Sequence, residues 1–109
     1  MSRIPPAALA VAGLLAAFLA VVPVHAATFQ GRIVDGVRYQ GSILNADYGL
    51  IDGVEIRFDG EQAYVYLRGG GRLVLLLQSE EIADPHCIPA DDLQRGIVWE
   101  LNVRDLRHR

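Results

Sequence analysis

The order of apolar and polar residues divides the chain into two unlike parts. Residues 7 to 22 form an unbroken apolar run, whereas from Thr28 onward short β-branched and aromatic runs alternate with glycine-containing turns. The second part lacks sustained helical periodicity, so the pattern predicts an all-β domain. The six expected strands are Thr28–Val34, Val37–Leu44, Val54–Phe58, Gln62–Leu67, Arg72–Gln78 and Ile97–Val103.

The Asp59-Gly60 pair marks a hairpin between two of these strands. As a two-residue type I′ loop it places Ile56 opposite Ala63 and Val54 opposite Val65. Because side chains alternate between the two faces of a strand, these apolar residues share one face and their polar neighbours share the other. The hairpin is therefore expected to have one buried and one exposed face.

Two other connections are less regular. Asp35-Gly36 fits a three-residue bulged loop that pairs Ile33 with Val37. The segment from Ser79 to Arg95 holds two prolines and five acidic residues. Because proline cannot donate to a sheet ladder, this segment is expected to be a long acidic loop rather than a central strand.

Short strands with a wide last crossover predict a small single domain. Its expected form is a six-stranded antiparallel meander closing into a partly open barrel of the SH3-like or OB-like kind. A two-layer sandwich is the alternative. Trp99 lies on the apolar side of the last strand, and we expect it to be the main packing anchor of the core.

The apolar run near the amino terminus has the form of a signal peptide. Arg3 precedes the run, and the small residues Val24 and Ala26 occupy the −3 and −1 positions of a cleavage site before Ala27. A signal helix within residues 1–26 would be removed, and a single domain, 27–109, would be exported to the periplasm or secreted. The alternative is an uncleaved membrane anchor, which the flanking prolines disfavour.

Composition narrows the function of the exported part. It contains all 13 acidic residues, nine of the ten arginines and no lysine, giving a net charge near −4 (9 − 13). This balance argues against nucleic acid as a partner, and no membrane span is expected after cleavage. Cys87 is the sole cysteine, so no disulfide can form within the chain, and we expect its thiol to be buried as a small hydrophobe.

Candidate chemistry is concentrated in the acidic segment. Asp84, His86, Cys87, Asp91 and Asp92 offer oxygen, nitrogen and sulfur ligands, but their spacing fits neither a zinc nor a calcium motif. Cys87 is a candidate reactive thiol, although an adjacent histidine in an extended segment points to the other side. We therefore assign no catalytic residue, cofactor or metal and expect a protein that is not an enzyme.

The outward face of the Asp59-Gly60 hairpin is the best candidate binding surface. Tyr64 and Tyr66 lie there near Arg57 and Arg68, where they could stack on a protein, a peptide or a glycan. The alternative is that Tyr66 merely covers Gly53 across the hairpin. The sequence thus favours a small exported non-catalytic module that binds or scaffolds in the cell envelope or outside the cell. The alternative function is a thiol- or metal-dependent activity built on the Asp84–Asp92 loop.

Overall fold

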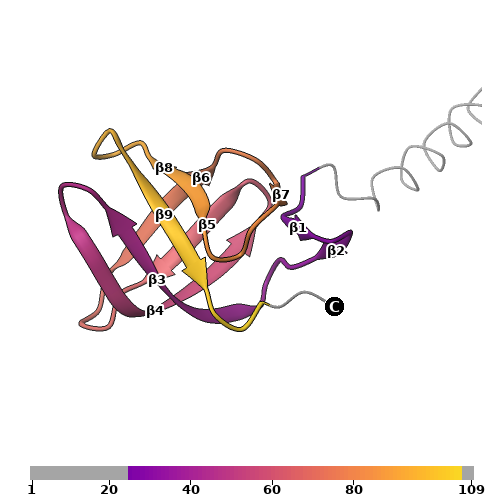
Figure 1. The fold of residues 1–109 in the computed structure, drawn as a ribbon, viewed down its shortest axis with the longest axis horizontal. Coiled ribbons are helices and arrows are strands. Elements are labelled where there is room, and N and C mark those ends of the chain that lie inside the picture. The colour runs from indigo at the N-terminus through magenta and orange to yellow at the C-terminus, as the bar shows by residue number, and fades with distance from the viewer. Residues whose placement is uncertain (1–24, 107–109) are drawn as a thin grey trace, which may run out of the picture.

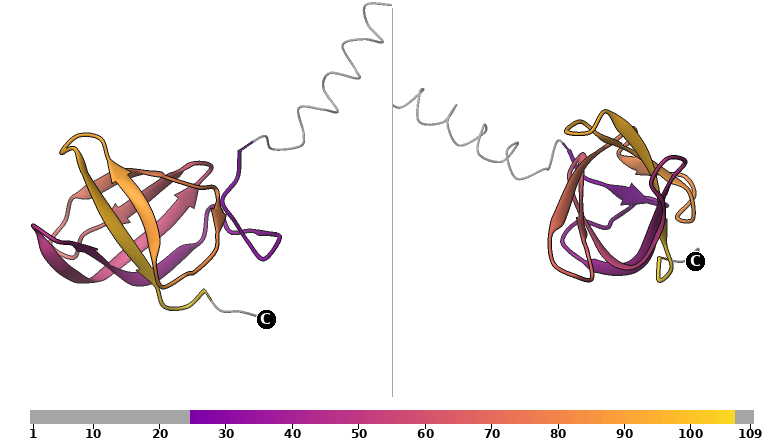
Figure 2. Two further views of the ribbon diagram at one scale, coloured as in Figure 1. Left: turned by 45° about the horizontal axis from the view of Figure 1, so that its top comes forward. Right: turned by 90° about the vertical axis from the view of Figure 1, so that its left-hand side faces the viewer.

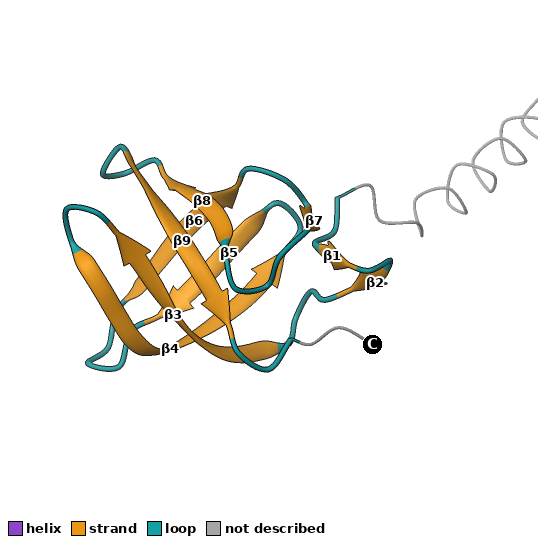
Figure 3. Ribbon diagram, in the orientation of Figure 1, coloured by secondary structure: helices purple, strands orange, loops and turns teal. Residues whose placement is uncertain are grey.

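A computed structural model of the chain describes residues 25–106 (Figure 1). The predicted signal helix and the apolar run at 7–22 lie outside these residues. Within residues 25–106 the chain forms strands and loops without a helix (Figure 3), and so without a helix of membrane-spanning character. The strands are β1 (Thr28–Phe29), β2 (Arg32–Ile33), β3 (Arg38–Asn45), β4 (Gly49–Asp59), β5 (Gln62–Tyr66), β6 (Arg72–Leu77), β7 (Glu81–Ile82), β8 (Ile88–Asp92) and β9 (Ile97–Val103).

Six of the described strands form a closed barrel in the order β3-β4-β5-β6-β8-β9 (Figure 2). Every neighbouring pair is antiparallel, and β9 closes the barrel by pairing with β3, with Ile43 opposite Leu101. The predicted six-stranded antiparallel meander is confirmed, and the barrel is closed rather than partly open. Closure pairs both edges of the sheet, which a sandwich would leave open.

The core of the barrel follows from the alternation along its strands. Ile56, Phe58 and Val65 are fully buried because they point inward, while their neighbours in sequence point outward. The bounds predicted for β9 match those observed. Trp99, 2% exposed, is part of the core as expected, as is the fully buried Leu101.

The predicted strand Thr28–Val34 is wrong. Gln30 and Gly31 adopt left-handed φ values of 52° and 79°, which turn the chain back so that β1 pairs with β2. The bulged hairpin between Ile33 and Val37 is also wrong, since Asp35 forms a parallel bridge with Phe58 instead. Together with β7, these two short strands form a three-stranded sheet beside one end of the barrel.

The prediction of one long acidic loop from 79 to 95 is also wrong, because this segment contains β7 and the barrel strand β8. Pro89 lies opposite Glu100 of β9, and its carbonyl accepts a hydrogen bond from the Gln78 N–H at 3.3 Å. In an antiparallel ladder the N and the carbonyl of one residue face the same neighbour. The N–H that Pro89 lacks would therefore face the end of β6, where the loss of a ladder bond is tolerated.

The β4–β5 hairpin keeps the predicted faces but not the predicted register. Asp59 pairs with Gln62, so the two-residue loop is Gly60-Glu61, shifted by one residue from the predicted Asp59-Gly60. Gly60 has a φ of 63°, whereas the φ of Glu61 is not positive. One positive φ, at the first loop residue, fits a type II′ turn, and a type I′ turn would need two. Moving the loop by one residue changes the cross-strand partner of each residue by two positions. Each side chain therefore stays on its predicted face, but Tyr66 lies opposite Glu55, not Gly53.

Strand β4 begins at Gly49 rather than at the predicted Val54. The Asn45 side chain explains the turn before it, because its Oδ1 accepts hydrogen bonds from the N–H groups of Asp47 and Tyr48, at 2.8 and 3.0 Å. An asparagine side chain that bonds to the backbone after it favours a tight turn. The turn lets β3 and β4 pair along nearly their whole length.

Candidate functional site

The outer wall of strands β3 to β6 carries a cluster that we call the arginine–tyrosine face. In the register of the sheet, Arg38, Arg57 and Tyr64 lie side by side on β3, β4 and β5. The neighbouring row holds Glu55 and Tyr66. The members of the face are Arg38, Arg57, Arg68, Arg72, Tyr64 and Tyr66, to which the predicted residues Arg57, Tyr64 and Tyr66 all belong.

Guanidinium groups stack on both tyrosine rings of this face. The Arg38 guanidinium carbon lies 4.4 Å from the centre of the Tyr66 ring. Tyr64 contacts the guanidinium groups of Arg57, at 4.7 Å, and Arg72, at 5.2 Å. All three distances fall within the range of cation–π attraction, so the rings hold the arginines in fixed positions on the surface.

Hydrogen bonds also hold the side chains of the face in fixed positions. The Nε and Nη2 groups of Arg57 donate to the Tyr66 hydroxyl over 3.4 and 3.3 Å. The hydrogen bond from Arg57 and the positive charges of Arg57, Arg38 and Arg72 outweigh partial burial and lower the pKa of Tyr66. The same hydrogen bond raises the pKa of Arg57, which therefore stays charged.

The face concentrates like charges in one place. Arg38 lies directly opposite Arg57 in the β3–β4 ladder, an arrangement that destabilises a sheet because the two cations repel. Glu55 relieves part of this repulsion, with its Oε1 at 3.4 Å from Nη1 of Arg38. Positive charge thus gathers on one wall of a chain whose net charge is −3.

Arg68 extends the face over the adjacent backbone. A side chain at Gly53 would bring a Cβ within 2.8 Å of the Arg68 guanidinium, so that guanidinium lies directly over the glycine. The prediction that Tyr66 covers Gly53 is therefore wrong, and the residue responsible is Arg68. The correct β4–β5 register would have indicated this from the sequence, because Gly53 and Arg68 continue the ladder that pairs Glu55 with Tyr66.

The acidic segment does not assemble a comparable site. Cys87 is exposed, so the prediction of a buried thiol is wrong. The Cys87 thiol donates to Glu100 Oε1 at 3.7 Å, and the charge of Glu100, with partial burial and Asp84, raises the pKa of the thiol. Nδ1 of the neighbouring His86 lies 3.1 Å from Oδ1 of Asn102.

The other candidate ligands in this segment are separated. Asp92 is buried beneath the β8–β9 turn and accepts hydrogen bonds from Trp99 and Arg95, whereas Asp91 accepts one from the Gln78 amide at 2.9 Å. A pocket of about 290 Å³ lies beside Cys87, between β7 and the start of β8. Within residues 25–106 no group of three or more His, Cys, Asp or Glu side chains is placed to hold a metal ion.

Fold and site together describe a small closed β-barrel with an ordered basic and aromatic wall. Comparisons with protein-family models, with curated proteins and with solved structures find no match for this chain.

Proposed function

We propose that this protein is a small exported β-barrel module that binds, without catalysis, an acidic segment of a protein partner. The observation that carries the proposal is the stacking of Arg38, Arg57 and Arg72 on Tyr64 and Tyr66. Repulsion between Arg38 and Arg57 is a cost to the fold, and costs of this kind are typical of functional surfaces.

The stacking selects the chemistry of the partner. Tyr64 contacts two guanidinium groups and Tyr66 one, so each ring already stacks on at least one cation. A neutral glycan would need a free ring face to stack upon. Guanidinium groups instead present planar pairs of N–H donors that match the two oxygens of a carboxylate.

The surroundings of the face favour a protein over an acidic polysaccharide. Val74, 43% exposed, lies beside Tyr64 in the ladder and adds an apolar side chain to the surface that a partner would contact. Exposed amides border the face at Gln40 and Gln62. Tyrosine and arginine with apolar neighbours and a polar rim are the composition of protein interfaces.

The export part of the proposal is supported by the amino-terminal sequence. Arg3, the apolar run at 7–22 and the small residues at Val24 and Ala26 satisfy the requirements of a signal peptide. An exported domain with one cysteine must rely on its core for stability, and the closed barrel supplies a continuous core.

The test is direct binding of a fluorescent oligo-glutamate peptide to the purified protein. We expect binding that weakens at least tenfold in Arg57→Gln, since one bidentate charged contact is lost. Arg95→Gln, in the β8–β9 turn away from the face, removes the same charge and should leave the affinity within twofold. An oligo-glutamine peptide and polygalacturonate serve as further ligands.

Each outcome bears on the proposal. Selective binding of oligo-glutamate that depends on Arg57 supports it. Equal binding of oligo-glutamine, or equal affinity in the two arginine variants, would contradict recognition of carboxylates by this face. Tighter binding of polygalacturonate than of oligo-glutamate would overturn the assignment of a protein partner.

A further inference from the structure

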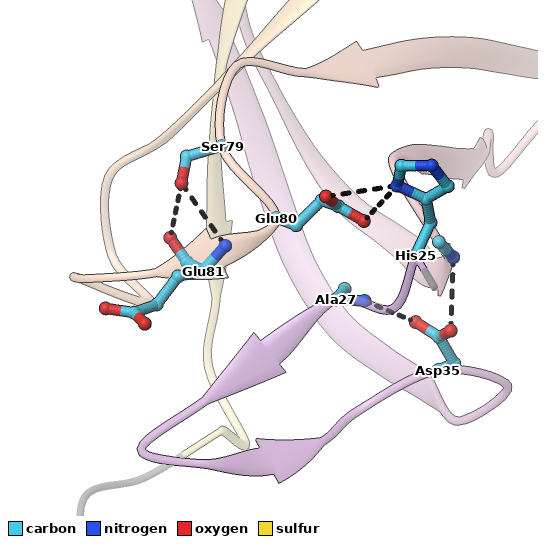
Figure 4. Close-up of polar contacts among 7 residues, drawn as sticks. His25, Ala27, Asp35, Ser79, Glu80 and Glu81 are labelled. Atoms are coloured by element: carbon cyan, nitrogen blue, oxygen red, sulfur yellow. Dashed lines mark hydrogen bonds and ion pairs between the residues drawn. The ribbon is translucent and has the colours of Figure 1, made fainter. Parts of the chain in front are cut away.

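The first residue of the predicted mature chain is fixed at the end of the barrel. Ala27 is fully buried, and its N–H donates to Oδ1 of Asp35 at 3.0 Å. Its carbonyl accepts a hydrogen bond from the Val34 N–H at 2.9 Å. Figure 4 shows the Asp35 carboxylate pointing at this nitrogen from the connection between β2 and β3.

The carboxylate of Asp35 is held in place by contacts other than Ala27. Its Oδ2 accepts a hydrogen bond from the Gly60 N–H, at 3.1 Å, in the β4–β5 turn. The next residue, Gly36, donates its N–H to the Phe58 carbonyl at 2.9 Å. Asp35 is therefore positioned by β4 and its turn, ready to receive a donor at the place that Ala27 occupies.

The residue two places before Ala27 makes a different and exposed contact. Nδ1 of His25 lies 3.2 Å from the Glu80 carboxylate, and 59% of the His25 side chain is exposed (Figure 4). Cleavage after Ala26 would remove this contact. The contacts of Ala27 and of the Thr28 N–H, which donates to the Glu80 carbonyl at 2.9 Å, would stay with the barrel.

We propose that cleavage after Ala26 turns the nitrogen of Ala27 into an ion-pair partner of Asp35 and so locks the mature amino terminus onto the barrel. Water hydrolyses the Ala26–Ala27 peptide bond, and Ala26 leaves with the removed segment as a carboxylate. The nitrogen of Ala27 takes up protons and becomes an ammonium group. This inference rests on the export part of the proposed function.

The new charge strengthens a contact that already exists. A hydrogen bond between an ammonium group and a carboxylate is about twice as strong as one between neutral groups. The other charged groups on the adjoining segments are Asp59 and Glu61 flanking Gly60, Glu80 and Glu81 beside β1, and Arg32 on β2. Four of these five are acidic, so the surroundings also favour a positive amino terminus.

The pH dependence follows from this charge. Burial alone would lower the pKa of an amine, but the exposed His25 and half-buried Ala26 leave on cleavage and open this nitrogen to water. Pairing with Asp35 then favours the protonated amino group and raises its pKa in the folded state above its ordinary value of about 7.7–8.0. The stabilisation is complete below that ordinary value and is lost as the pH rises through the folded pKa.

The absence of lysine from the sequence makes this amino group the sole amine of the mature chain. The full chain is expressed in an exporting bacterial host, and its amino terminus is identified by mass spectrometry. An acetylating reagent then neutralises the α-amino group but leaves an N–H that can still donate to Asp35. We expect the acetylated protein to melt about 4–8 °C lower at pH 6.5, and this difference to vanish above pH of about 10.

Asp35→Asn is the matched variant, because it retains an oxygen acceptor without the charge. Acetylation should not change its Tm, and if this variant does not fold, the wild-type comparison still decides. An export-host product that retains residues 1–26 would overturn both the export proposal and this inference. A chain that begins at Ala27 but melts equally with and without acetylation would overturn the inference and leave export standing.

Discussion

The indole Nε1–H of Trp99 donates a hydrogen bond to Oδ2 of Asp92 across 3.2 Å inside the barrel. Asp92 is 2% exposed, and its carboxylate also accepts hydrogen bonds from the backbone N–H and the guanidinium of Arg95. The contact joins the largest aromatic side chain of the core to the turn between β8 and β9. It makes Asp92 a structural residue, whereas the sequence predicts that it lies in a long acidic loop.

Replacing Asp92 should therefore destabilise the fold. Asp92→Ala leaves the buried Trp99 N–H without an acceptor, which we expect to cost about 1–3 kcal/mol in the free energy of unfolding. Asp91→Ala is the control, since its partly exposed carboxylate accepts one bond, from Gln78, and its loss should cost less than about 0.5 kcal/mol. Urea denaturation measures both values. Equal effects of the two substitutions would contradict a structural role for Asp92.

The stability conferred by Asp92 should depend on pH. Burial acts to raise its pKa, but the hydrogen bonds from Trp99 and Arg95 and the charge of Arg95 outweigh burial and lower it. A carboxyl group with a lowered folded pKa stabilises the protein above its unfolded pKa of about 3.9, and this contribution is lost as the pH falls through the folded pKa. The stability difference between wild type and Asp92→Asn should shrink as the pH is lowered from 6 to 2. A constant difference over that range would contradict the assignment.

Gly41 is required by the close approach of β3 to β9. A Cβ at Gly41 would lie 2.0 Å from the Asn102 carbonyl oxygen, and a backbone atom cannot move aside cheaply. Gly41→Ala should therefore cost about 3 kcal/mol or more. Gly69→Ala is the matched control, because a Cβ there has nothing within 4 Å and its φ is not left-handed. Thermal unfolding of the two variants tests the closure, and similar Tm values would contradict it.

The exposed thiol of Cys87 should react without unfolding, but slowly. The negative charge of Glu100 is the main cause of its raised pKa, so little thiolate forms at neutral pH. We expect Glu100→Gln to accelerate labelling by an aromatic disulfide reagent several-fold at pH 7.5. Glu81→Gln is the control, because it removes an exposed carboxylate that is not among the causes of the raised Cys87 pKa. Labelling of wild type that begins only upon denaturation would show that the thiol is buried.

Tyr66 and Tyr39 should ionise at distinguishable pH values. The hydrogen bond from Arg57 lowers the pKa of Tyr66, whereas burial is the main cause of a raised pKa at Tyr39. Ultraviolet titration should show one phenol that ionises early, and Tyr66→Phe should abolish that component. Tyr48→Phe, an exposed tyrosine outside the face, should leave it unchanged. An early component that persists in Tyr66→Phe would contradict the contact between Arg57 and Tyr66.

The sequence predicted side-chain faces better than strand partners. A register error of two residues preserves alternation, so Tyr64 and Tyr66 were placed correctly outside while Tyr66 received the wrong partner. Pro89 led to a wrong prediction for its segment. The N–H that it lacks is a loss only where a neighbouring strand offers a carbonyl to accept a hydrogen bond. Which strand lies on that side is set by the closure of the barrel. The burial of Asp92 had no local signal, since its partner Trp99 lies on the next strand.

Parts of the candidate site were likewise accessible from the sequence. Arg57 and both tyrosines were identified from the alternation along the predicted β4–β5 hairpin. Arg38 and Arg72 were not, because their place beside the tyrosines is set by pairings of β3 with β4 and of β5 with β6. A correct register across all these strands would have revealed the cluster.

The most direct test of the central claim is NMR observation of the arginine Nε–H signals while an oligo-glutamate peptide is added. We predict that the signals of Arg38, Arg57 and Arg72 shift together with saturation, that the signal of Arg95 stays unchanged, and that 0.5 M salt abolishes the shifts. Shifts confined to other arginines, or none at peptide concentrations up to 1 mM, would contradict binding of acidic segments by the arginine–tyrosine face.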